Sequence, residues 1–241
     1  MNCKNCNTEL NLNYCPNCGQ PKQLKRIDRH YIVHEIEHVL HFERGILYTI
    51  RELTTNPGQN TQKYLSENRN RLVKPILFII ITSLIYTILN HFFHIEDGYV
   101  KYHDAKGENL SSVASMVKWV QDHYGYANIM MGIFIAFWLK LFFRKYNYNF
   151  YEILIMLCFV MGMGMLIFSV FVIVEGLTHF KMMTIAGVIG IGYCVWAIGQ
   201  FYDKKKITSY VKALSAYILG IITFWIFPIL IGTIIDLLSK L

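Results

Sequence analysis

Hydrophobic positions are spread unevenly along this chain of 241 residues. Residues 1–74 mix apolar, polar and charged positions, and five long apolar runs follow them. A helix that crosses a bilayer needs about 20 largely apolar residues. The runs that meet or approach this length are Pro75–His94, Ala127–Phe143, Glu152–Val174, Met182–Tyr202 and Ala213–Leu238. The pattern predicts an all-α polytopic membrane protein with about five transmembrane helices in residues 75–241, the fifth kinked or broken at Pro228.

The segment 27–74, ahead of the first run, has the periodicity of amphipathic helices that lie at an interface. Between Ile27 and Leu53 apolar residues recur at helical spacing, which predicts one or two helices with a bend or break at Gly45. The Asn56-Pro57-Gly58 tripeptide predicts a stop and a turn. A further short helix, Thr61–Arg71, is expected to lead into the first span.

Residues 1–22 contain two C-x2-C pairs, a pattern typical of zinc ribbons. The pairs are Cys3 with Cys6 and Cys15 with Cys18, and Gly19 permits the tight turn that follows the second pair. Four thiolates enclose a d¹⁰ cation in a closed tetrahedron, which predicts a structural Zn²⁺ site rather than a catalytic one. So short a segment cannot build an adequate apolar core, and the metal is therefore expected to supply its folding energy.

Two other uses of these cysteines fit the sequence less well. Disulfides need an oxidising compartment, and the N-terminal residues lack the apolar region of a secretory signal. A redox C-x-x-C would need a thioredoxin-like βαβ context, which the pattern does not predict. Cys158 and Cys194 lie inside apolar runs, where a small buried hydrophobic role is expected.

One face of the first amphipathic helix carries a stripe of histidines. The stripe contains His34, Glu37, His38 and His41. His38 lies four residues after His34, His41 lies three after His38, and Glu37 lies three after His34 and four before His41, so they share this face. The stripe fits a polar face toward water or lipid headgroups. It also fits a second metal site or a catalytic cluster, because imidazoles at this spacing can share one metal. The His34-Glu35-Ile36-Glu37-His38 pattern is a weak match to a zincin helix.

Positive charge near the ends of the runs predicts the orientation in the membrane, since cytosolic loops are enriched in Lys and Arg. One side holds Lys63, Arg69, Arg71 and Lys74 before the first run, Lys140, Arg144 and Lys145 after the second, and Lys204, Lys205, Lys206 and Lys212 between the last two. The other side holds fewer: Lys101, Lys106, Lys118, Lys181 and Lys240. This predicts a cytosolic N-terminus and, with five spans, an outside C-terminus. Lys63, Arg69, Arg71 and Lys74 are further expected to contact anionic lipid headgroups.

Carboxylates avoid the centres of the apolar runs. Glu152, Glu175 and Asp236 lie at run edges, whereas coupled carriers usually keep ionisable groups near the bilayer midplane. This argues against a coupled transporter. In the loop between the first two runs, Val113, Met116, Val117 and Val120 predict a short interfacial helix, with a ligand-binding lid as the alternative.

Small residues recur within the third and fourth runs. They are Gly162, Gly164, Ala186, Gly190 and Cys194. Small side chains let helix backbones approach closely, so helix packing is expected, and a pore lining is the alternative.

Composition agrees with a lipid environment. Hydrophobic residues make up 54% of the chain and charged residues 16%, against about 25% charged in soluble domains. The net charge of +7 could suggest nucleic acid, but the basic residues cluster beside apolar runs and the ribbon has few aromatic residues for base stacking. Nucleic-acid binding is therefore disfavoured.

Three patterns lie in the N-terminal third of the chain. They are the cysteine pattern that ends at Gln20, then Gly45, Thr49, Leu53, Pro57 and Gly58 at their spacing, then Tyr64, Leu65, Arg69, Arg71 and Pro75. Together they give the chain a resemblance to a family of bacterial membrane proteins of unknown function. It implies a location in the bacterial cytoplasmic membrane and no particular activity.

These observations leave two hypotheses for function. The first is a non-enzymatic membrane scaffold whose zinc ribbon docks a cytosolic protein partner. The second is a membrane-embedded enzyme or carrier that acts on lipid through the histidine stripe. The sequence does not predict an oligomeric state.

Overall fold

The computed structural model describes residues 2, 6, 8, 9, 13–18, 45–69, 71–95, 112–122 and 124–238. The chain divides into two units, Met1–Glu43 and Arg44–Leu241. In the first unit Asn2 and Glu9 form an isolated antiparallel bridge. The second unit is a helical bundle, and the predicted all-α class is confirmed. Its helices are α2 (Ile46–Thr55), α3 (Pro57–Ser66), α4 (Pro75–Phe93), α5 (Ser112–Asp122), α6 (Tyr124–Phe142), the 3₁₀ turn η3 (Arg144–Tyr146), α7 (Phe150–Thr178), α8 (Met183–Asp203) and α9 (Ile207–Leu238).

Four helices of the bundle are long and apolar enough to cross a membrane: α4, α7, α8 and α9. The part of α6 that qualifies as apolar, Tyr126–Phe142, is shorter. The prediction of a polytopic membrane protein with about five spans is thus confirmed. Helix α9 continues without a break through Pro228. At 1.5 Å per residue it is roughly 48 Å long, more than the ~30 Å hydrocarbon core.

Helix α4 has the polarity that lipid requires. Its exposed face is a stripe of large apolar side chains at intervals of four residues: Ile76, Ile80, Leu84, Ile88 and Phe92. Its buried face carries Thr82, Ser83 and Asn90 among apolar neighbours. A helix in water has the opposite arrangement, so this side of the bundle suits contact with hydrocarbon.

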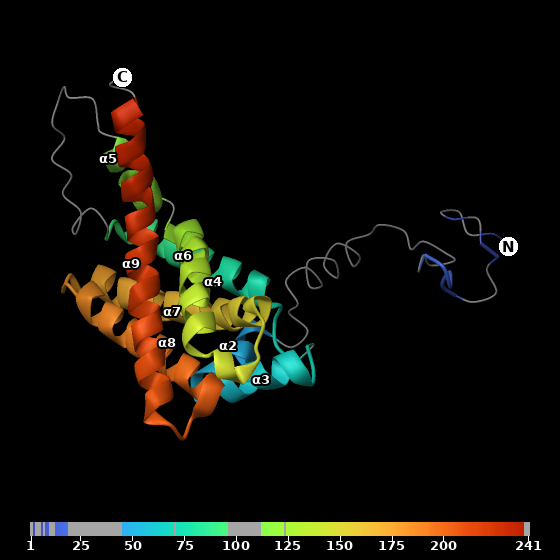
Figure 1. Cartoon of the computed structure of the whole chain (residues 1–241). Helices are drawn as coiled ribbons and strands as arrows, with labels where there is room; N and C mark the ends of the chain where they lie inside the picture. The colour runs from blue at the N-terminus through green and yellow to red at the C-terminus, as the bar shows by residue number, and fades with distance from the viewer. Residues whose placement is uncertain are drawn as a thin grey trace. The chain divides into compact units, whose positions relative to one another are not determined.

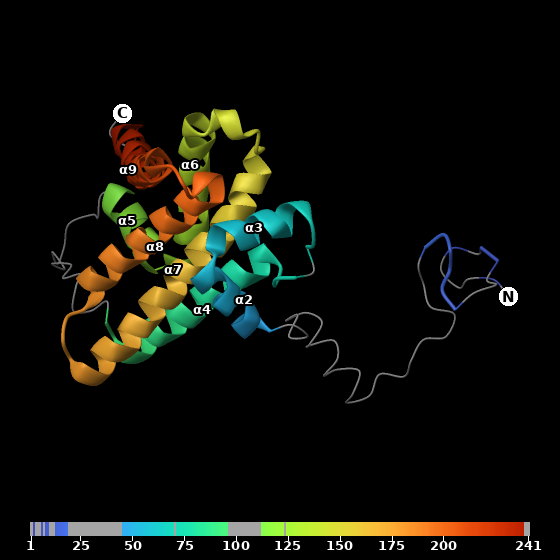
Figure 2. The same ribbon diagram turned by 90° about the horizontal axis from the view of Figure 1, so that it is seen from below.

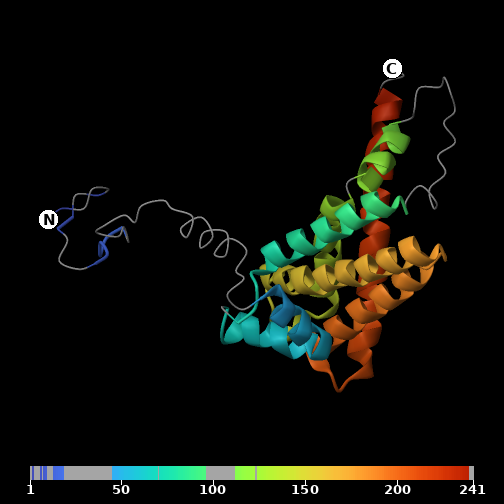
Figure 3. The same cartoon turned by 180° about the vertical axis from the view of Figure 1, so that it is seen from behind.

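Close contacts at glycine residues hold the long helices together. Helix α4 lies beside α7 over most of its length (Figures 2 and 3), where Phe78 packs onto Gly162 and Phe93 onto Gly176. Helix α6 runs beside α9 (Figure 1), with the backbone of Ile135 against Gly220. Packing, the role expected for the small residues of the third run, therefore applies to Gly162.

The short helices before the first span differ from the sequence prediction in their bounds. Gly45 has a positive φ of 47°, and α2 begins directly after it. The part of the predicted helix before Gly45 lies outside the described residues. The predicted stop is confirmed, because α2 ends at Thr55. The predicted turn over residues 56–58 and the predicted helix from Thr61 to Arg71 are wrong, because α3 runs from Pro57 to Ser66. Only Asn56 separates α2 from α3, because Pro57 occupies the first turn of a helix, where its missing N–H costs nothing.

Candidate metal centre and the helical cap before the first span

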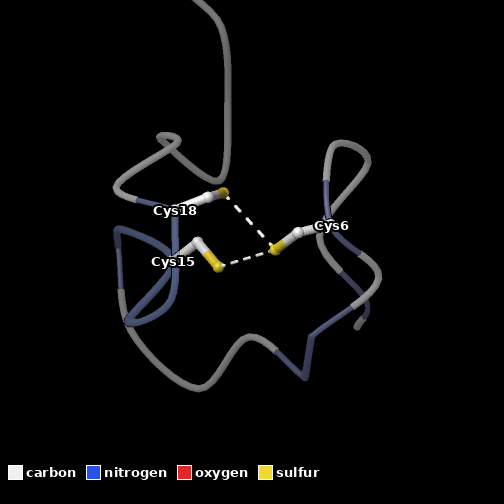
Figure 4. Close-up of side chains that lie close together, drawn as sticks. All are labelled: Cys6, Cys15 and Cys18. Atoms are coloured by element: carbon white, nitrogen blue, oxygen red, sulfur yellow. Dashed lines mark hydrogen bonds between the residues drawn. The ribbon is translucent and has the colours of Figure 1, made fainter.

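Three of the four predicted ligands converge in the N-terminal unit. The Sγ atom of Cys6 lies 3.5 Å from that of Cys15 and 3.4 Å from that of Cys18 (Figure 4). The three sulfurs all lie within 4.8 Å of one another. In a tetrahedral site with 2.3 Å Zn–S bonds, ligand sulfurs are roughly 3.8 Å apart. The described thiols therefore fit a metal ion, whereas a disulfide would bring two sulfurs to about 2 Å.

The surroundings of Cys6 favour its thiolate form. Hydrogen bonds to Thr8, whose Oγ1 lies 3.3 Å from the sulfur, and a contact with Cys18 lower the pKa of the Cys6 thiol to about 6. Thiolates, not thiols, are metal ligands. Cys15 is buried and Cys18 is exposed.

Other predicted site residues lie outside the described residues. They are the fourth thiol, Cys3, and the histidine stripe of His34, Glu37, His38 and His41. The identity of the metal, the complete ligand set and the second site stay predictions.

The residues 45–74, here called the cap, comprise α2, α3 and the linker to α4. Thr49 is fully buried, and its hydroxyl accepts a hydrogen bond of 3.0 Å from the backbone N–H of Val73. Leu53 is also buried, and its carbonyl accepts a 2.9 Å hydrogen bond from the Tyr193 hydroxyl of α8. The cap thus folds back on itself and is fastened to the bundle.

Helix α3 packs against the C-terminal end of α8. The backbone N–H of Gly58 donates to Oε1 of Gln200 at 2.9 Å, and Nε2 of Gln62 donates to the carbonyl of Phe201 at 2.5 Å. Tyr64, on the same helix, meets Phe159 of α7 edge-on, with ring centroids 5.2 Å apart. Several residues on which the family resemblance rests therefore serve to seat the cap.

The four cations proposed to contact lipid divide into two kinds. Lys63, Arg69 and Lys74 are exposed. Arg71 instead forms an ion pair with Glu52, its Nη2 lying 2.5 Å from a carboxylate oxygen, and it also donates to the Tyr48 hydroxyl at 3.3 Å. Arg71 thus joins the linker to α2, a role that the sequence pattern did not predict.

Contacts bring the cation-rich segments to one end of the bundle. The rings of Phe143 and Tyr202 stack with centroids 3.7 Å apart, which joins the end of α6 to the end of α8. Lys212 of α9 donates to the carbonyl of Phe142 at 3.5 Å, and α3 lies against Phe201. The cap, the α6–α7 connection and the α8–α9 turn therefore share one end (Figures 1 and 3).

The three carboxylates at the edges of the apolar runs all bind backbone N–H groups at helix starts. Glu152 completes a capping box with Asn149 at the start of α7. Glu175 accepts from the N–H groups of Met182 and Met183 at the start of α8, at 2.7 and 3.1 Å. Asp236 accepts from Ser112, the first residue of α5, at 2.9 Å. Negative charge stabilises helix N-termini, so each of these three carboxylates stabilises the start of a helix.

Sequence reasoning missed the polar residues Gln62, Tyr193 and Gln200, whose contacts fasten the cap. Their partners lie about 140 residues away along the chain, and hydropathy patterns carry no signal for such pairs. A polar residue near the end of an apolar run is a weak hint of such a contact, because a buried amide or hydroxyl must find a hydrogen-bond partner.

Comparison with known proteins adds one match. A family model described as "Protein of unknown function (DUF3667)" matches residues 43–87, that is, the cap and the first part of α4. No curated protein matches the chain, and no solved structure matches it. Over this segment the chain is similar to a family of unknown function, and with its apolar helices it is a membrane protein of unassigned activity.

Proposed function

We propose that this chain is a non-enzymatic membrane scaffold with a structural zinc site in the cytosol. Residues 1–22, which hold this site and are here called the zinc module, dock a protein partner at the bilayer. The observation that carries the proposal is the convergence of Cys6, Cys15 and Cys18 in a unit distinct from the bundle. With Cys3 as the fourth ligand the coordination is closed. A closed site has no open position for substrate, so it stabilises a surface rather than a reaction.

The cation distribution supports a cytosolic N-terminus in the bacterial cytoplasmic membrane. The end of the bundle formed by the cap, the α6–α7 connection and the α8–α9 turn carries most of the Lys and Arg residues found near span ends. Cytosolic ends of membrane proteins are enriched in these residues. The zinc module precedes the cap in sequence, so we assign it to the same, reducing side, where thiolates persist.

The exposed cations of the cap are evidence that this end of the bundle attaches to the inner leaflet. Lys63, Arg69 and Lys74 are exposed at the end of the bundle assigned to the cytosol. A basic residue near an anionic membrane surface contributes about 1 kcal/mol of attraction. These three side chains would therefore hold anionic headgroups, while Arg71 maintains the shape of the cap through Glu52.

Metal analysis tests the zinc site. Protein purified in detergent without chelators is expected to contain about one zinc per chain. The Cys15→Ser variant should lose it, whereas Cys158→Ser, which alters a thiol in α7, should retain it. A full complement of zinc in Cys15→Ser would contradict the site. A second zinc that disappears in a His34→Ala, His38→Ala variant would favour the histidine stripe and the enzyme or carrier hypothesis.

Partner capture tests docking. Membranes that contain the whole chain, a variant lacking residues 1–26, Cys15→Ser or Cys158→Ser would be cross-linked, solubilised and purified through a C-terminal tag. We expect a protein that co-purifies with the whole chain and with Cys158→Ser but not with the other two. The same set of proteins on all four samples would contradict a docking role for the zinc module.

A further inference from the structure

The bundle contains a cavity of about 150 Å³ between α6, α7, α8 and α9, with Val120 of α5 also in its lining. Helices α8 and α9 meet at their connecting turn and diverge from it (Figure 1), and residues of both diverging halves line the space. Gly164 on α7 and Gly187 and Gly190 on α8 are part of the lining. A Cβ atom placed on Gly187 would meet nothing within 4 Å. Gly164 and Gly190 face neighbouring helices instead, since their Cβ atoms would lie 3.6 Å from Sγ of Cys194 and 3.2 Å from the Phe168 ring. Gly187 therefore leaves room for something other than a neighbouring helix.

The lining is neutral and mostly apolar. Phe168 and Phe224 contribute aromatic surface, Met131 and Met165 contribute thioethers, and among the described residues that line the cavity none carries a charge. Removing an ion from water without a counter-charge is costly, so the buried part of any occupant must be neutral. Apolar and aromatic walls with few polar groups are typical of sites for small organic molecules.

One polar group in this lining has no partner. Asn128 of α6 is 3% exposed, and its Nδ2 makes no hydrogen bond. A buried donor left unpaired costs about 1–3 kcal/mol, and nearly all such groups in folded proteins are satisfied. An occupant that offers an acceptor oxygen would satisfy this amide. The orphaned donor is thus an independent indication that the cavity receives a ligand.

Size and access narrow the class of ligand. An apolar cavity of about 150 Å³ binds benzene, so this space suits one six-membered ring rather than a whole lipid headgroup. Trp225 of α9 lines the cavity and is half-buried, and Ile191 of α8 lines it and is 36% exposed. The wall between the diverging helices is therefore partly open, on two helices that also expose Val188, Ile189, Ile222 and Ile226. A hydrocarbon tail attached to the ring can leave through this opening into lipid.

We propose that the cavity binds the ring of a lipid-soluble quinone, with Asn128 donating a hydrogen bond to one ring carbonyl. The ring is neutral and flat, it carries the acceptor that Asn128 lacks, and the aromatic side chains of Phe168 and Phe224 can pack against it. The proposal concerns binding alone and does not depend on the zinc site.

Decylubiquinone titrated into the purified full-length protein tests the proposal, with tryptophan fluorescence as the readout. Trp225 borders the cavity, so we expect saturable quenching in the wild type and loss of the saturable part in Trp225→Phe. Asn128→Leu should weaken binding about tenfold, which corresponds to the loss of about 1.4 kcal/mol.

Two glycine variants on α8 separate cavity filling from general disturbance. Gly187→Leu adds a side chain to the lining and should abolish saturable binding. Gly192→Leu makes the same change on the same helix, also with nothing within 4 Å, but at an exposed position outside the lining. This control should bind decylubiquinone like the wild type.

Three results would overturn the proposal. One is quenching that never saturates in the wild type. Another is saturable binding that survives both Asn128→Leu and Gly187→Leu. The third is a phospholipid, detected by native mass spectrometry, that Gly187→Leu loses and that decylubiquinone does not displace from the wild type, because the cavity would then be an acyl-chain site.

Discussion

The backbone N–H of Gly58 donates a 2.9 Å hydrogen bond to the side-chain oxygen of Gln200, although 142 residues separate them along the chain. The contact seats the first turn of α3 on the last turn of α8. A Cβ atom at position 58 would lie 2.3 Å from the backbone nitrogen of Phe201 and 2.4 Å from the carbonyl carbon of Gln200. Backbone atoms cannot rotate away, so only glycine permits this approach.

Gly58→Ala should therefore separate the cap from the bundle. We expect a loss of about 3 kcal/mol in the free energy of unfolding, the upper part of the range for overpacking, because the clash is with backbone. Unfolding of detergent-solubilised protein by titration with sodium dodecyl sulfate, followed by circular dichroism, measures it. Gly192→Ala is the control, since a Cβ atom there meets nothing within 4 Å. Equal stability of the two variants would contradict this account of the α3–α8 contact.

Thr49→Val tests the contact between α2 and the linker. The replacement preserves the branched shape but removes the acceptor for the N–H of Val73, in a site where Thr49 is fully buried. An unsatisfied buried N–H costs about 1–3 kcal/mol, and the free energy of unfolding should fall by that amount.

The matched control for Thr49→Val is Thr54→Val on the same helix. Thr54 is exposed, and its hydroxyl only donates to the carbonyl of Ile50, one turn back. This change should alter stability by less than about 0.5 kcal/mol. If both variants were equally stable in the same denaturant titration, the Thr49–Val73 bond would have no part in holding the cap.

The fold class follows from the sequence because membrane helices are specified locally. An apolar run of sufficient length forms a helix wherever lipid is the solvent, since its backbone must satisfy its own hydrogen bonds. The start of α2 after Gly45 was predictable for a similar reason, because it depends on one residue's φ. The start of α3 was mispredicted, because proline is common both in turns and at the first position of a helix, and Pro57 occupies the helix position.

The cap's fastening could not be read from the chain, because it depends on pairs distant in sequence. Arg71 was grouped with its neighbouring cations, yet it pairs with Glu52 of α2. The sequence pattern did not predict the cavity either. Gly164 and Gly190 were expected to serve helix packing, with a pore lining as the alternative. The structure has both in the wall of the cavity, and both also pack against a neighbouring helix, Gly164 at Cys194 and Gly190 at Phe168. Whether a small residue closes a gap or leaves one depends on the helix opposite.

Charge removal should distinguish lipid contact from structural pairing in the cap. A variant with Lys63→Gln, Arg69→Gln and Lys74→Gln should retain wild-type stability but carry less anionic phospholipid, measured by native mass spectrometry after mild detergent extraction. The expected loss is about 1 kcal/mol of membrane attraction per cation, and the difference should shrink as ionic strength rises.

Arg71→Gln should have the opposite profile. The ion pair with Glu52 is partly exposed, so its loss should lower the free energy of unfolding by about 1 kcal/mol or less and leave bound anionic lipid unchanged. If Arg71→Gln reduced bound lipid as strongly as the triple variant did, Arg71 would belong with the headgroup contacts and the division between the two kinds of cation would be wrong.

The orientation of the bundle is testable at its two ends. A recognition sequence for a site-specific protease would be inserted after Lys205, in the turn between α8 and α9, or after Phe180, which is 70% exposed between α7 and α8. In sealed right-side-out vesicles, added protease should cut the site after Phe180 and spare the site after Lys205. Inverted vesicles should give the reverse pattern.

An N-terminal epitope tag with its own cleavage site should behave like the Lys205 insertion, because the cation-rich end and the zinc module are assigned to one side of the membrane. Cleavage of the tag and of the Lys205 site from opposite sides would place the thiolates on the oxidising face, where four free cysteines would be expected to form disulfides instead of holding zinc.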